Sequence, residues 1–515
     1  MIHRPCARGN RDFQRNPHAA AASFLPLLLA TATAVAAAPD RGPDVPDELV
    51  RVFRERNGEV FTDWPDPRAV IVVTGELDGY IEPCGCTGKE NQKGGLSRRH
   101  NLFRALEAAK WPFVPLDLGG QVKRFGRQTE AKFQSIVDGL RAMRYDAVGF
   151  GPADLRLPCE ELVAAVAPIG DRPTPYVSAN VGLLGIDSNI TPRFRVVEAG
   201  GLKIGVTTVL GAKGAADLKN DDVEVVPAER ALATVAADLA KAGCDHQVLL
   251  CFADPEESKA LAAKFPQFDV VATAGGGDEP PREAQKLPGG AVFLELGHKG
   301  MFAVGVAFCG DGRQVRTARI PLDARWGESP DMIALLGTYQ DKLEALGFKG
   351  LNLVPIHHPT GRRFAGSAAC AECHPKAFEV WENSGHAKAL TTLEEAKPRR
   401  DFDPECLSCH VTGWAPQRFE PFEGGFAGAK ETPHLAHQGC ENCHGPAAAH
   451  TAVERGDVRA TEVERDRLRQ ELVLSLATPE GKQKAVNNCL ECHDLDNSQK
   501  FDFDEYWPAV AHSEE

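Results

Sequence analysis

Cys370-Ala371-Glu372-Cys373-His374 is the stretch that decides how the C-terminal third of this chain folds. The same spacing returns three more times, as Cys406-Leu407-Ser408-Cys409-His410, Cys440-Glu441-Asn442-Cys443-His444 and Cys489-Leu490-Glu491-Cys492-His493. Two thiols at this spacing can add to the two vinyl groups of one porphyrin, and the histidine that follows can reach its iron. The pattern predicts four covalent c-type haems, with His374, His410, His444 and His493 as proximal iron ligands.

Zinc is the main alternative, because paired thiols and a histidine also bind that metal. Zinc sites do not require a histidine at the same offset after every pair of cysteines, as this chain has it four times. Structural zinc is also less expected in an exported chain than covalent haem. We therefore interpret the four motifs as haem attachment sites.

The second axial ligand of each iron sets the range of its potential. No methionine follows Met332, so this part of the chain cannot supply a methionine ligand, and histidine is the obvious substitute. The candidate distal ligands are His386, His434, His437, His450 and His512. Low-potential haems with two histidine ligands are the expectation. One haem left five-coordinate would instead bind a small external ligand.

Four haems within about 150 residues leave too little chain for an ordinary hydrophobic core. We expect the porphyrins themselves to fill the interior, stacked for electron exchange in a mainly helical, loop-rich domain. Aromatic side chains are expected to pack against them: Trp381, Trp414, Phe426, Phe501, Tyr506 and Trp507.

The segment from Gly366 to His512 resembles the tetrahaem cytochrome c-554 family. Gly439-Cys440-Glu441-Asn442-Cys443-His444-Gly445-Pro446 is the most specific match, and the first motif is followed by Trp381-Glu382-Asn383-Ser384-Gly385-His386-Ala387. The resemblance implies electron transfer, with His386, His450 and His512 as distal ligands. It does not settle the roles of His434 and His437.

The first residues are typical of an export signal. Arg4, Arg8, Arg11 and Arg15 form a basic leader, an apolar run spans 24–38, and small residues occupy 34–36. We predict a signal peptide over 1–38, a Pro-rich linker over 39–67, and a periplasmic or otherwise exported protein. Membrane association is expected only through an uncleaved leader.

Predicted strands and helices then alternate along the chain, which indicates a layered α/β domain over 68–325. Apolar runs indicate strands at 69–73, 113–117, 145–150, 175–178, 204–209, 247–252, 269–273 and 301–308. Helices are expected at 96–110 and 228–242. A further helix at 331–346 belongs to a predicted helical linker over 326–362, and the C-terminal domain follows over 363–515.

The order from Ile71 to about Ile320 resembles secreted 5′-nucleotidases of the calcineurin-like metallophosphoesterase fold, through Asp117-Leu118-Gly119-Gly120 and Ser178-Ala179-Asn180-Val181 among other stretches. The family's metal ligands are largely replaced. Glu76 and Asp78 stand where Asp-x-His would begin the site, Gly120 replaces an aspartate, and Gly151-Pro152-Ala153-Asp154 replaces Gly-Asn-His-Glu. Two-metal hydrolysis needs several carboxylate and imidazole ligands, so the resemblance implies a degenerate, catalytically silent domain.

Pro83-Cys84-Gly85-Cys86 lies where this family handles its substrate. Cys84 and Cys86 could form a metal or redox site, but a structural loop is the favoured interpretation. Outside the haem motifs and the leader, the other cysteines are Cys159, Cys244, Cys251 and Cys309. Cys251 and Cys309 fall on predicted strands, where buried free thiols are expected.

The chain has 515 residues and a net charge of −14, which argues against a nucleic-acid partner. We predict an electron carrier between redox partner proteins rather than an enzyme. One alternative is a haem oxidoreductase that acts on a small nitrogen or sulfur compound at a five-coordinate haem. The other is a phosphoesterase with an altered metal site built from Glu76, Asp78, Asp117 and Asp154.

Overall fold

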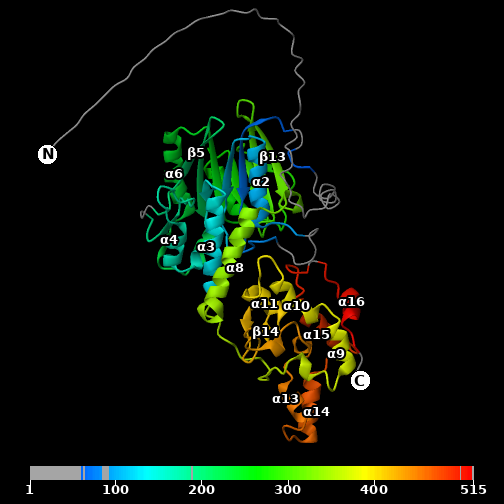
Figure 1. The fold of residues 1–515 in the computed structure, drawn as a ribbon. Helices are drawn as coiled ribbons and strands as arrows, with labels where there is room; N and C mark the ends of the chain where they lie inside the picture. The colour runs from blue at the N-terminus through cyan, green and yellow to red at the C-terminus, as the bar shows by residue number, and fades with distance from the viewer. Residues whose placement is uncertain (1–58, 62–63, 84–91, 187–189, 499, 513–515) are drawn as a thin grey trace, which may run out of the picture. The chain divides into compact units, whose positions relative to one another are not determined.

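The computed structural model describes residues 59–61, 64–83, 92–186, 190–498 and 500–512. The predicted signal peptide and most of the predicted linker lie outside the described residues, as do Cys84 and Cys86. The described chain consists of a layered α/β domain followed by a C-terminal domain of short helices and loops (Figure 1).

Two β-sheets carry the α/β domain. The first has the strand order β13-β12-β1-β2-β3 and the second β10-β11-β9-β8-β6-β5. The first comprises β1 (Pro67–Thr74), β2 (Phe113–Asp117), β3 (Ala147–Val148), β12 (Phe302–Cys309) and β13 (Gln314–Pro321). The second comprises β5 (Arg195–Ala199), β6 (Leu202–Leu210), β8 (His246–Phe252), β9 (Val270–Thr273), β10 (Gln285–Lys286) and β11 (Val292–Glu295). A small pair, β4 (Val181–Leu183) and β7 (Val223–Val225), stands apart.

The structure explains why the sequence of β1 is a continuous apolar run. Successive side chains of a strand point to opposite faces. Ile71 and Val73 lie in a core that also contains side chains of the second sheet, whereas Val70 and Val72 lie in a core shared with helices. Both faces of β1 are therefore covered, as expected of a central strand, which here runs parallel to β2 and antiparallel to β12.

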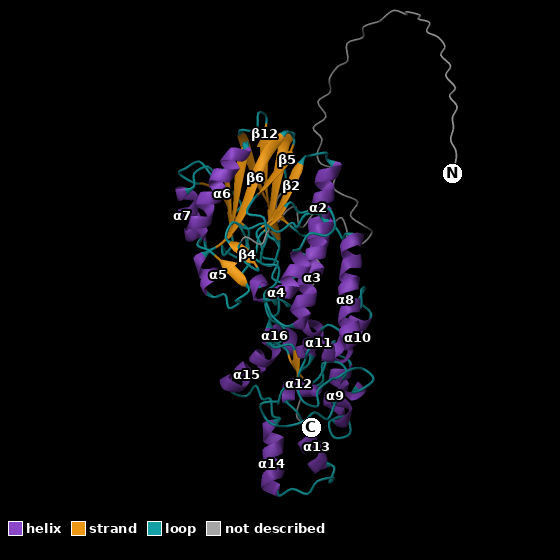
Figure 2. Ribbon diagram, turned by 90° about the vertical axis from the view of Figure 1, so that its left-hand side faces the viewer, coloured by secondary structure: helices purple, strands orange, loops and turns teal. Residues whose placement is uncertain are grey.

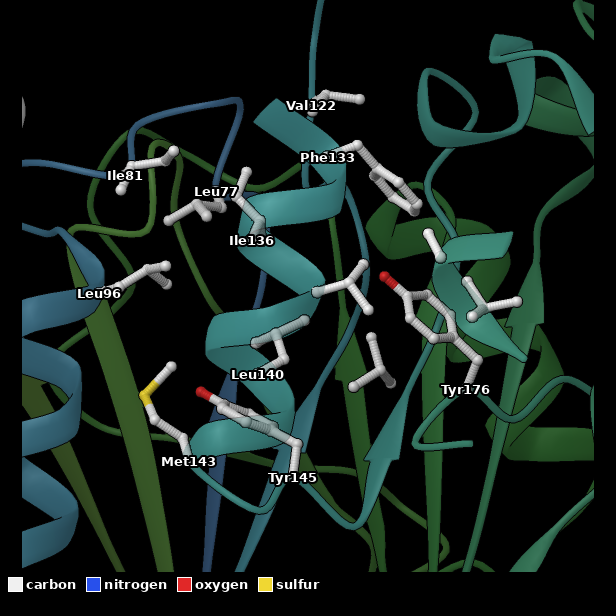
Figure 3. Close-up of a cluster of buried hydrophobic side chains, with 14 of the residues drawn as sticks. Leu77, Ile81, Leu96, Val122, Phe133, Ile136, Leu140, Met143, Tyr145 and Tyr176 are labelled. Atoms are coloured by element: carbon white, nitrogen blue, oxygen red, sulfur yellow. The ribbon is translucent and has the colours of Figure 1, made fainter. Parts of the chain in front are cut away.

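Helices cover the outer faces of both sheets, which gives an α-β-β-α arrangement (Figure 2). On the first sheet these are α2 (Leu96–Ala108), α3 (Arg127–Ala142) and α8 (Pro330–Gly350), and on the second α6 (Ala228–Ala242) and α7 (Pro255–Lys264). Figure 3 shows α3 directing Phe133, Ile136 and Leu140 into this core, near Tyr145 and Tyr176. Two shorter helices, α4 (Cys159–Val166) and α5 (Ala212–Ala216), complete the domain.

The predicted layered α/β fold is confirmed, and the helix expected over 228–242 is α6. Two expected strands are wrong in extent. The run at 145–150 forms only the two-residue β3, and the run at 175–178 makes only an isolated bridge between Tyr176 and Val148. Pro175 supplies a carbonyl but no N–H, so the pairing cannot extend along a regular ladder.

The C-terminal domain consists of short helices joined by loops. These are α9 (Pro375–Glu382), α10 (Ala389–Glu394), α11 (Pro404–His410), α12 (Cys440–His444), α13 (Ala448–Glu454), α14 (Glu462–Glu471), α15 (Pro479–Leu490) and α16 (Phe503–Tyr506), with one small strand pair, β14 (Trp414–Ala415) and β15 (Glu420–Pro421). Its main apolar cluster is small: Leu390, Leu393, Leu407, Val411, Trp414, Phe426 and Leu435. Throughout the described ranges, every helix is too short or too polar to cross a membrane.

Charged side chains link α3 to the helix that carries the second haem motif. Lys132 Nζ donates to Glu405 Oε2 at 2.6 Å, one residue before Cys406. Gln128 Nε2 donates to Asp403 at 2.7 Å, and Asp403 in turn caps α11 by accepting the backbone N–H of Glu405. Burial alone would raise the pKa of Glu405, but Lys132 and a nearby arginine hold it below its usual value.

A second buried ion pair fixes α2 against the end of β2. Arg99 Nη1 lies 3.0 Å from Asp117 Oδ2, and neither side chain is exposed. The Thr74 hydroxyl and the Gly119 N–H also donate to Asp117, at 2.6 and 2.9 Å. A buried carboxylate that loses its partner is strongly destabilising, so α2 is bound to the sheet through this contact.

Replacing Arg99 with methionine should therefore lower the free energy of unfolding by ~3–5 kcal/mol, because the buried Asp117 side chain would lose its ion-pair partner. Urea unfolding followed by circular dichroism would measure the change. Arg127→Met is the matched control, since Arg127 is half-exposed and pairs with Glu130 at 2.6 Å on the surface of α3. It should cost less than ~1 kcal/mol, and equal losses in both variants would contradict this account.

Candidate haem sites and the carboxyl edge of the sheet

Short helices present the thiols of the haem motifs. Helix α11 ends at His410 and contains both cysteines of the second motif, and α12 spans the whole third motif. Residues three apart lie on the same face of a helix, so the two thiols of such a motif point the same way. The first motif precedes α9, with His374 as its N-cap residue, and Cys489 of the fourth lies in the last turn of α15.

Three of the four predicted proximal histidines have one ring nitrogen held by the protein. Nδ1 of His410 lies 2.6 Å from the Ala389 carbonyl oxygen, and Nδ1 of His444 lies 2.8 Å from that of Leu472. A carbonyl only accepts, so each Nδ1 carries the proton and Nε2 keeps its lone pair. Nδ1 of His493 lies 2.9 Å from the Ser498 hydroxyl, which can either donate or accept. This is the arrangement that metal-binding histidines use.

Burial keeps these imidazoles neutral. Desolvation lowers the pKa of His410, His444 and His493 from the usual value of 6.5. Only a neutral imidazole can bind a metal ion, so low pKa values favour binding at neutral pH.

Two pairs of histidine rings lie at a separation that fits one metal ion between them. The ring centroids of His386 and His493 lie 6.2 Å apart, and those of His444 and His512 lie 5.7 Å apart. With nitrogen–metal bonds of about 2 Å, two imidazoles that share one ion place their centroids roughly 6 Å apart. The donor set and spacing therefore fit an iron with two histidine ligands at each position.

The remaining candidate histidines differ from one another. His450 lies on α13 near enough to His374 to lower its own pKa, although burial is the larger cause, and its Nδ1 is buried without a hydrogen bond. His434 is exposed in a short 3-10 turn. His437 accepts the N–H of Leu390 at Nδ1, at 3.2 Å.

Cysteines of different motifs lie next to each other. The side chains of Cys370 and Cys440 share a hydrogen bond, and so do those of Cys409 and Cys492. The fold thus brings the first motif to the third and the second to the fourth. The Asn488 side chain, just before the fourth motif, also donates to the carbonyl of Cys443 at 3.1 Å. The four sites form one contiguous group.

The aromatic side chains expected around the porphyrins lie in different surroundings. Trp414 and Phe426 are buried, and the Trp414 indole N–H donates to the Phe426 carbonyl at 2.9 Å. Phe501 stacks on the His493 ring, with centroids 4.6 Å apart. The Trp381 indole donates to the Gln438 carbonyl, whereas Tyr506 is exposed.

Glu441 is a buried carboxylate that sequence reasoning missed. It lies between the two cysteines of the third motif and accepts backbone N–H groups from Ala365, Gly366 and Ala447 at 2.7–3.1 Å. Glu441 therefore anchors the third motif to the backbone segment that precedes the first motif. Nothing in the sequence distinguishes Glu441 from the exposed Glu372 of the first motif.

The carboxyl edge of the first sheet holds the acidic residues of the phosphoesterase hypothesis, and they do not form a metal site. Asp117 pairs with Arg99. Asp154 accepts three backbone N–H groups, from Gly120, Val122 and Gly151, at 2.8–3.0 Å, and burial raises its pKa to about 7. Within the described ranges, no three His, Cys, Asp or Glu side chains gather as they would around a metal.

The position of the replaced aspartate is filled by an aromatic ring. A Cβ on Gly120 would lie 2.8 Å from the ring of Phe252, and Gly120 has a φ of +75° that favours glycine. Any carboxylate there would need both the ring and the backbone to move. Phe252 therefore closes the space that a metal ligand would need.

One acid and one imidazole do meet at this edge. Glu76 Oε1 lies 3.1 Å from His298 Nδ1, and burial raises the pKa of Glu76 to about 7. Glu76 and Asp78 both have positive φ values, 45° and 55°. Sequence reasoning missed His298, although its place just after β11, at the carboxyl end of a parallel strand, is where such folds put site residues. The predicted thiols Cys84 and Cys86 lie outside the described residues.

The C-terminal domain thus combines repeated thiol–imidazole motifs with pairs of imidazoles at a spacing that fits one metal ion. Residues 369–445 match the family model described as cytochrome c554 and c-prime, which confirms the predicted resemblance. The chain is 33% identical over 96 residues to cytochrome c-554 of Nitrosomonas europaea. This match covers 16% of the chain and 38% of the relative, so the chain spans less than half of that protein's length. The family match implies c-type haem iron.

The α/β domain is similar to solved structures of another kind. A 5′-nucleotidase precursor from Thermus thermophilus shares 17% identity, with 60% of this chain and 67% of that chain covered and a TM-score of 0.46. The calcineurin-like phosphoesterase YfkN from Bacillus subtilis shares 12% identity, with 53% and 97% covered and a TM-score of 0.42.

Glu441→Ala should destabilise the C-terminal domain by ~3 kcal/mol or more, because backbone donors that it now binds would lose their acceptor in a buried place. Thermal unfolding of the haem-loaded full chain, followed by Soret absorbance, would measure the loss. Glu372→Ala is the matched control within a haem motif, since Glu372 is exposed and lies 3.8 Å from Arg455. Similar transitions in both variants would show that Glu441 has no anchoring role.

Proposed function

We propose that this chain is an exported electron-transfer protein, with four covalent haems in its C-terminal domain and a non-hydrolytic α/β domain. The observation that carries the proposal is the pairing of imidazole rings, His386 with His493 and His444 with His512, beside thiols at the c-type spacing. Haem iron, when bound, supplies one-electron transfer between its ferrous and ferric states.

The ligand assignment follows from these contacts. His374, His410, His444 and His493 would be the proximal ligands, each next to its pair of cysteines. The facing rings support His386 as the distal ligand opposite His493, and His512 as the one opposite His444. His450 is the candidate opposite His374, because burial is the main cause of its lowered pKa but His374 lies near enough to lower it further. Iron with two histidine ligands and no methionine has a low potential.

The packing of the motifs supports one route for electrons through the domain. Contacts join the first motif to the third and the second to the fourth, and Asn488 joins the third to the fourth. Haem edges held by adjacent motifs would lie close together. Electrons would then pass between redox partner proteins through the order first, third, fourth, second, or its reverse.

A second function is favoured by one observation. Throughout the described ranges, the ring of His410 faces no other imidazole, although two of the other three predicted proximal histidines have a partner ring. The iron at His410 would be five-coordinate. It could bind a small nitrogen or sulfur compound, which would make the protein an oxidoreductase as well as a carrier.

The α/β domain contributes no hydrolytic chemistry to this proposal. Its acidic residues are used in internal hydrogen bonds and ion pairs, and Phe252 fills the space at Gly120. The domain would act as a scaffold. Export to the periplasm is supported by the basic, then apolar leader, and covalent haem attachment agrees with that compartment.

The test of the main proposal is the full chain, expressed with its leader in a haem-maturing host. We expect a Soret band and a mass increase of four porphyrins. In the reduced wild type, carbon monoxide should bind only one of the haems, the one at His410. His386→Ala and His512→Ala should each open one further haem to carbon monoxide.

His357→Ala is the matched control. His357 lies just before the C-terminal domain, is 85% exposed and pairs with Glu423 at 2.9 Å on the surface, so its loss should leave the carbon monoxide stoichiometry unchanged. A protein without four added porphyrins would overturn the proposal. Unchanged stoichiometry in both distal variants would overturn the ligand assignment alone.

Nucleotide hydrolysis tests the scaffold role separately. Purified protein with added Mn²⁺ should release no phosphate from nucleoside monophosphates above the level of an Asp154→Asn variant, because the described carboxylates form no metal cluster. Mn²⁺ should also leave the unfolding temperature of the α/β domain unchanged. Metal-dependent turnover that the substitution removes would mean that an altered metal site operates.

A further inference from the structure

His437 is fixed in an unusual backbone conformation between several haem motifs. Its φ is 69°, in the left-handed region that non-glycine residues rarely adopt. Its carbonyl accepts the Thr412 hydroxyl at 2.9 Å, and the next N–H, of Gln438, reaches the carbonyl of His386 at 3.2 Å. A left-handed residue costs roughly 1–2 kcal/mol, so these contacts hold the ring in a defined place.

The ring of His437 uses its Nδ1 as an acceptor. The backbone N–H of Leu390 donates to this atom at 3.2 Å. Because an amide N–H only donates, Nδ1 holds a lone pair, and in the neutral ring the proton is on Nε2. Burial lowers the pKa of His437, and Glu394 offsets this only in part, so the neutral ring is favoured. A ring in this state has no free nitrogen lone pair for iron.

The peptide unit between Ala389 and Leu390, which binds His437, also binds His410, the predicted proximal ligand of the second motif. The carbonyl of Ala389 accepts Nδ1–H of His410 at 2.6 Å, and the N–H of that peptide is the Leu390 group that binds His437. The three groups form one line of hydrogen bonds: His437, the 389–390 peptide, His410. Hydrogen bonds in such a chain polarise and strengthen one another.

We infer that His437 is a positioning residue for His410 rather than an iron ligand, and that it lowers the potential of the haem that His410 would bind. The lone pair of His437 draws the Leu390 proton and makes the Ala389 carbonyl a stronger acceptor. That carbonyl holds the His410 proton more firmly, so His410 becomes a more basic ligand. A more basic ligand stabilises ferric iron. The inference rests on the proposed function.

The contact also explains why a histidine occupies a strained position. Asparagine and glycine tolerate the left-handed conformation better. Asparagine places its Oδ1 two bonds from Cβ, as histidine places Nδ1, and it can accept the same N–H. Glycine fits the backbone but offers no acceptor. The two substitutions therefore separate the hydrogen bond from the backbone conformation.

The experiment uses the haem-loaded full chain with His437→Asn or His437→Gly, titrated by spectroelectrochemistry with carbon monoxide binding to identify the His410 haem. We expect a more positive potential for that haem in the Gly variant and a wild-type potential in the Asn variant. The iron–imidazole stretching band of the same reduced haem should move to lower frequency with Gly only.

Each result decides the inference. Equal potentials and band positions in all three proteins would overturn it. An additional carbon monoxide-binding haem in the Gly variant would show that His437 is an iron ligand, which also overturns it. Failure of the proposed function would look different from failure of this inference. The wild-type protein would then lack the four porphyrins and would show no Soret band to titrate.

Discussion

Histidine can offer one nitrogen to a metal only when the proton is held on the other, and in the C-terminal domain backbone carbonyls hold that proton on His410 and His444. Its short helices carry the motifs, but the acceptors lie elsewhere in the chain. His444 reaches a carbonyl 28 residues further on, and His410 reaches one 21 residues back. Each such bond closes a loop between segments that are distant in the sequence. Orientation of the rings and the path of the backbone are therefore set together.

The domain replaces apolar packing with polar anchoring. Its main apolar cluster is small for the length of chain that it must hold. Glu441 supplies part of what is missing, because one buried carboxylate binds backbone donors on both sides of the third motif. Such a group is stable only when all its partners are present. The fold thus depends on chemistry within the motifs, and porphyrins would add the rest of the interior.

The sequence predicted the parts whose signal is local. Apolar runs indicated β1, β2 and α6, and the repeated motif indicated the resemblance to the cytochrome c-554 family, which the match over residues 369–445 confirms. The failures have physical causes. Pro175 lies in an apolar run but cannot complete a ladder, and Glu441 and Arg99 look like surface charges because their partners are distant in the sequence. Distal histidines posed the same difficulty, since nothing in the sequence alone shows which rings will face each other.

The α/β domain is bound to the haem motifs by more than a linker. Lys132 of α3 neutralises Glu405 beside the second motif, and Tyr80 and Lys299, from the carboxyl edge of the sheet, bind Asp496 three residues after His493. Buried carboxylates without partners would be costly, and negative charge beside a haem favours its ferric form. The α/β domain therefore has a physical role in the C-terminal domain, because its lysines set the charge around the second and fourth motifs.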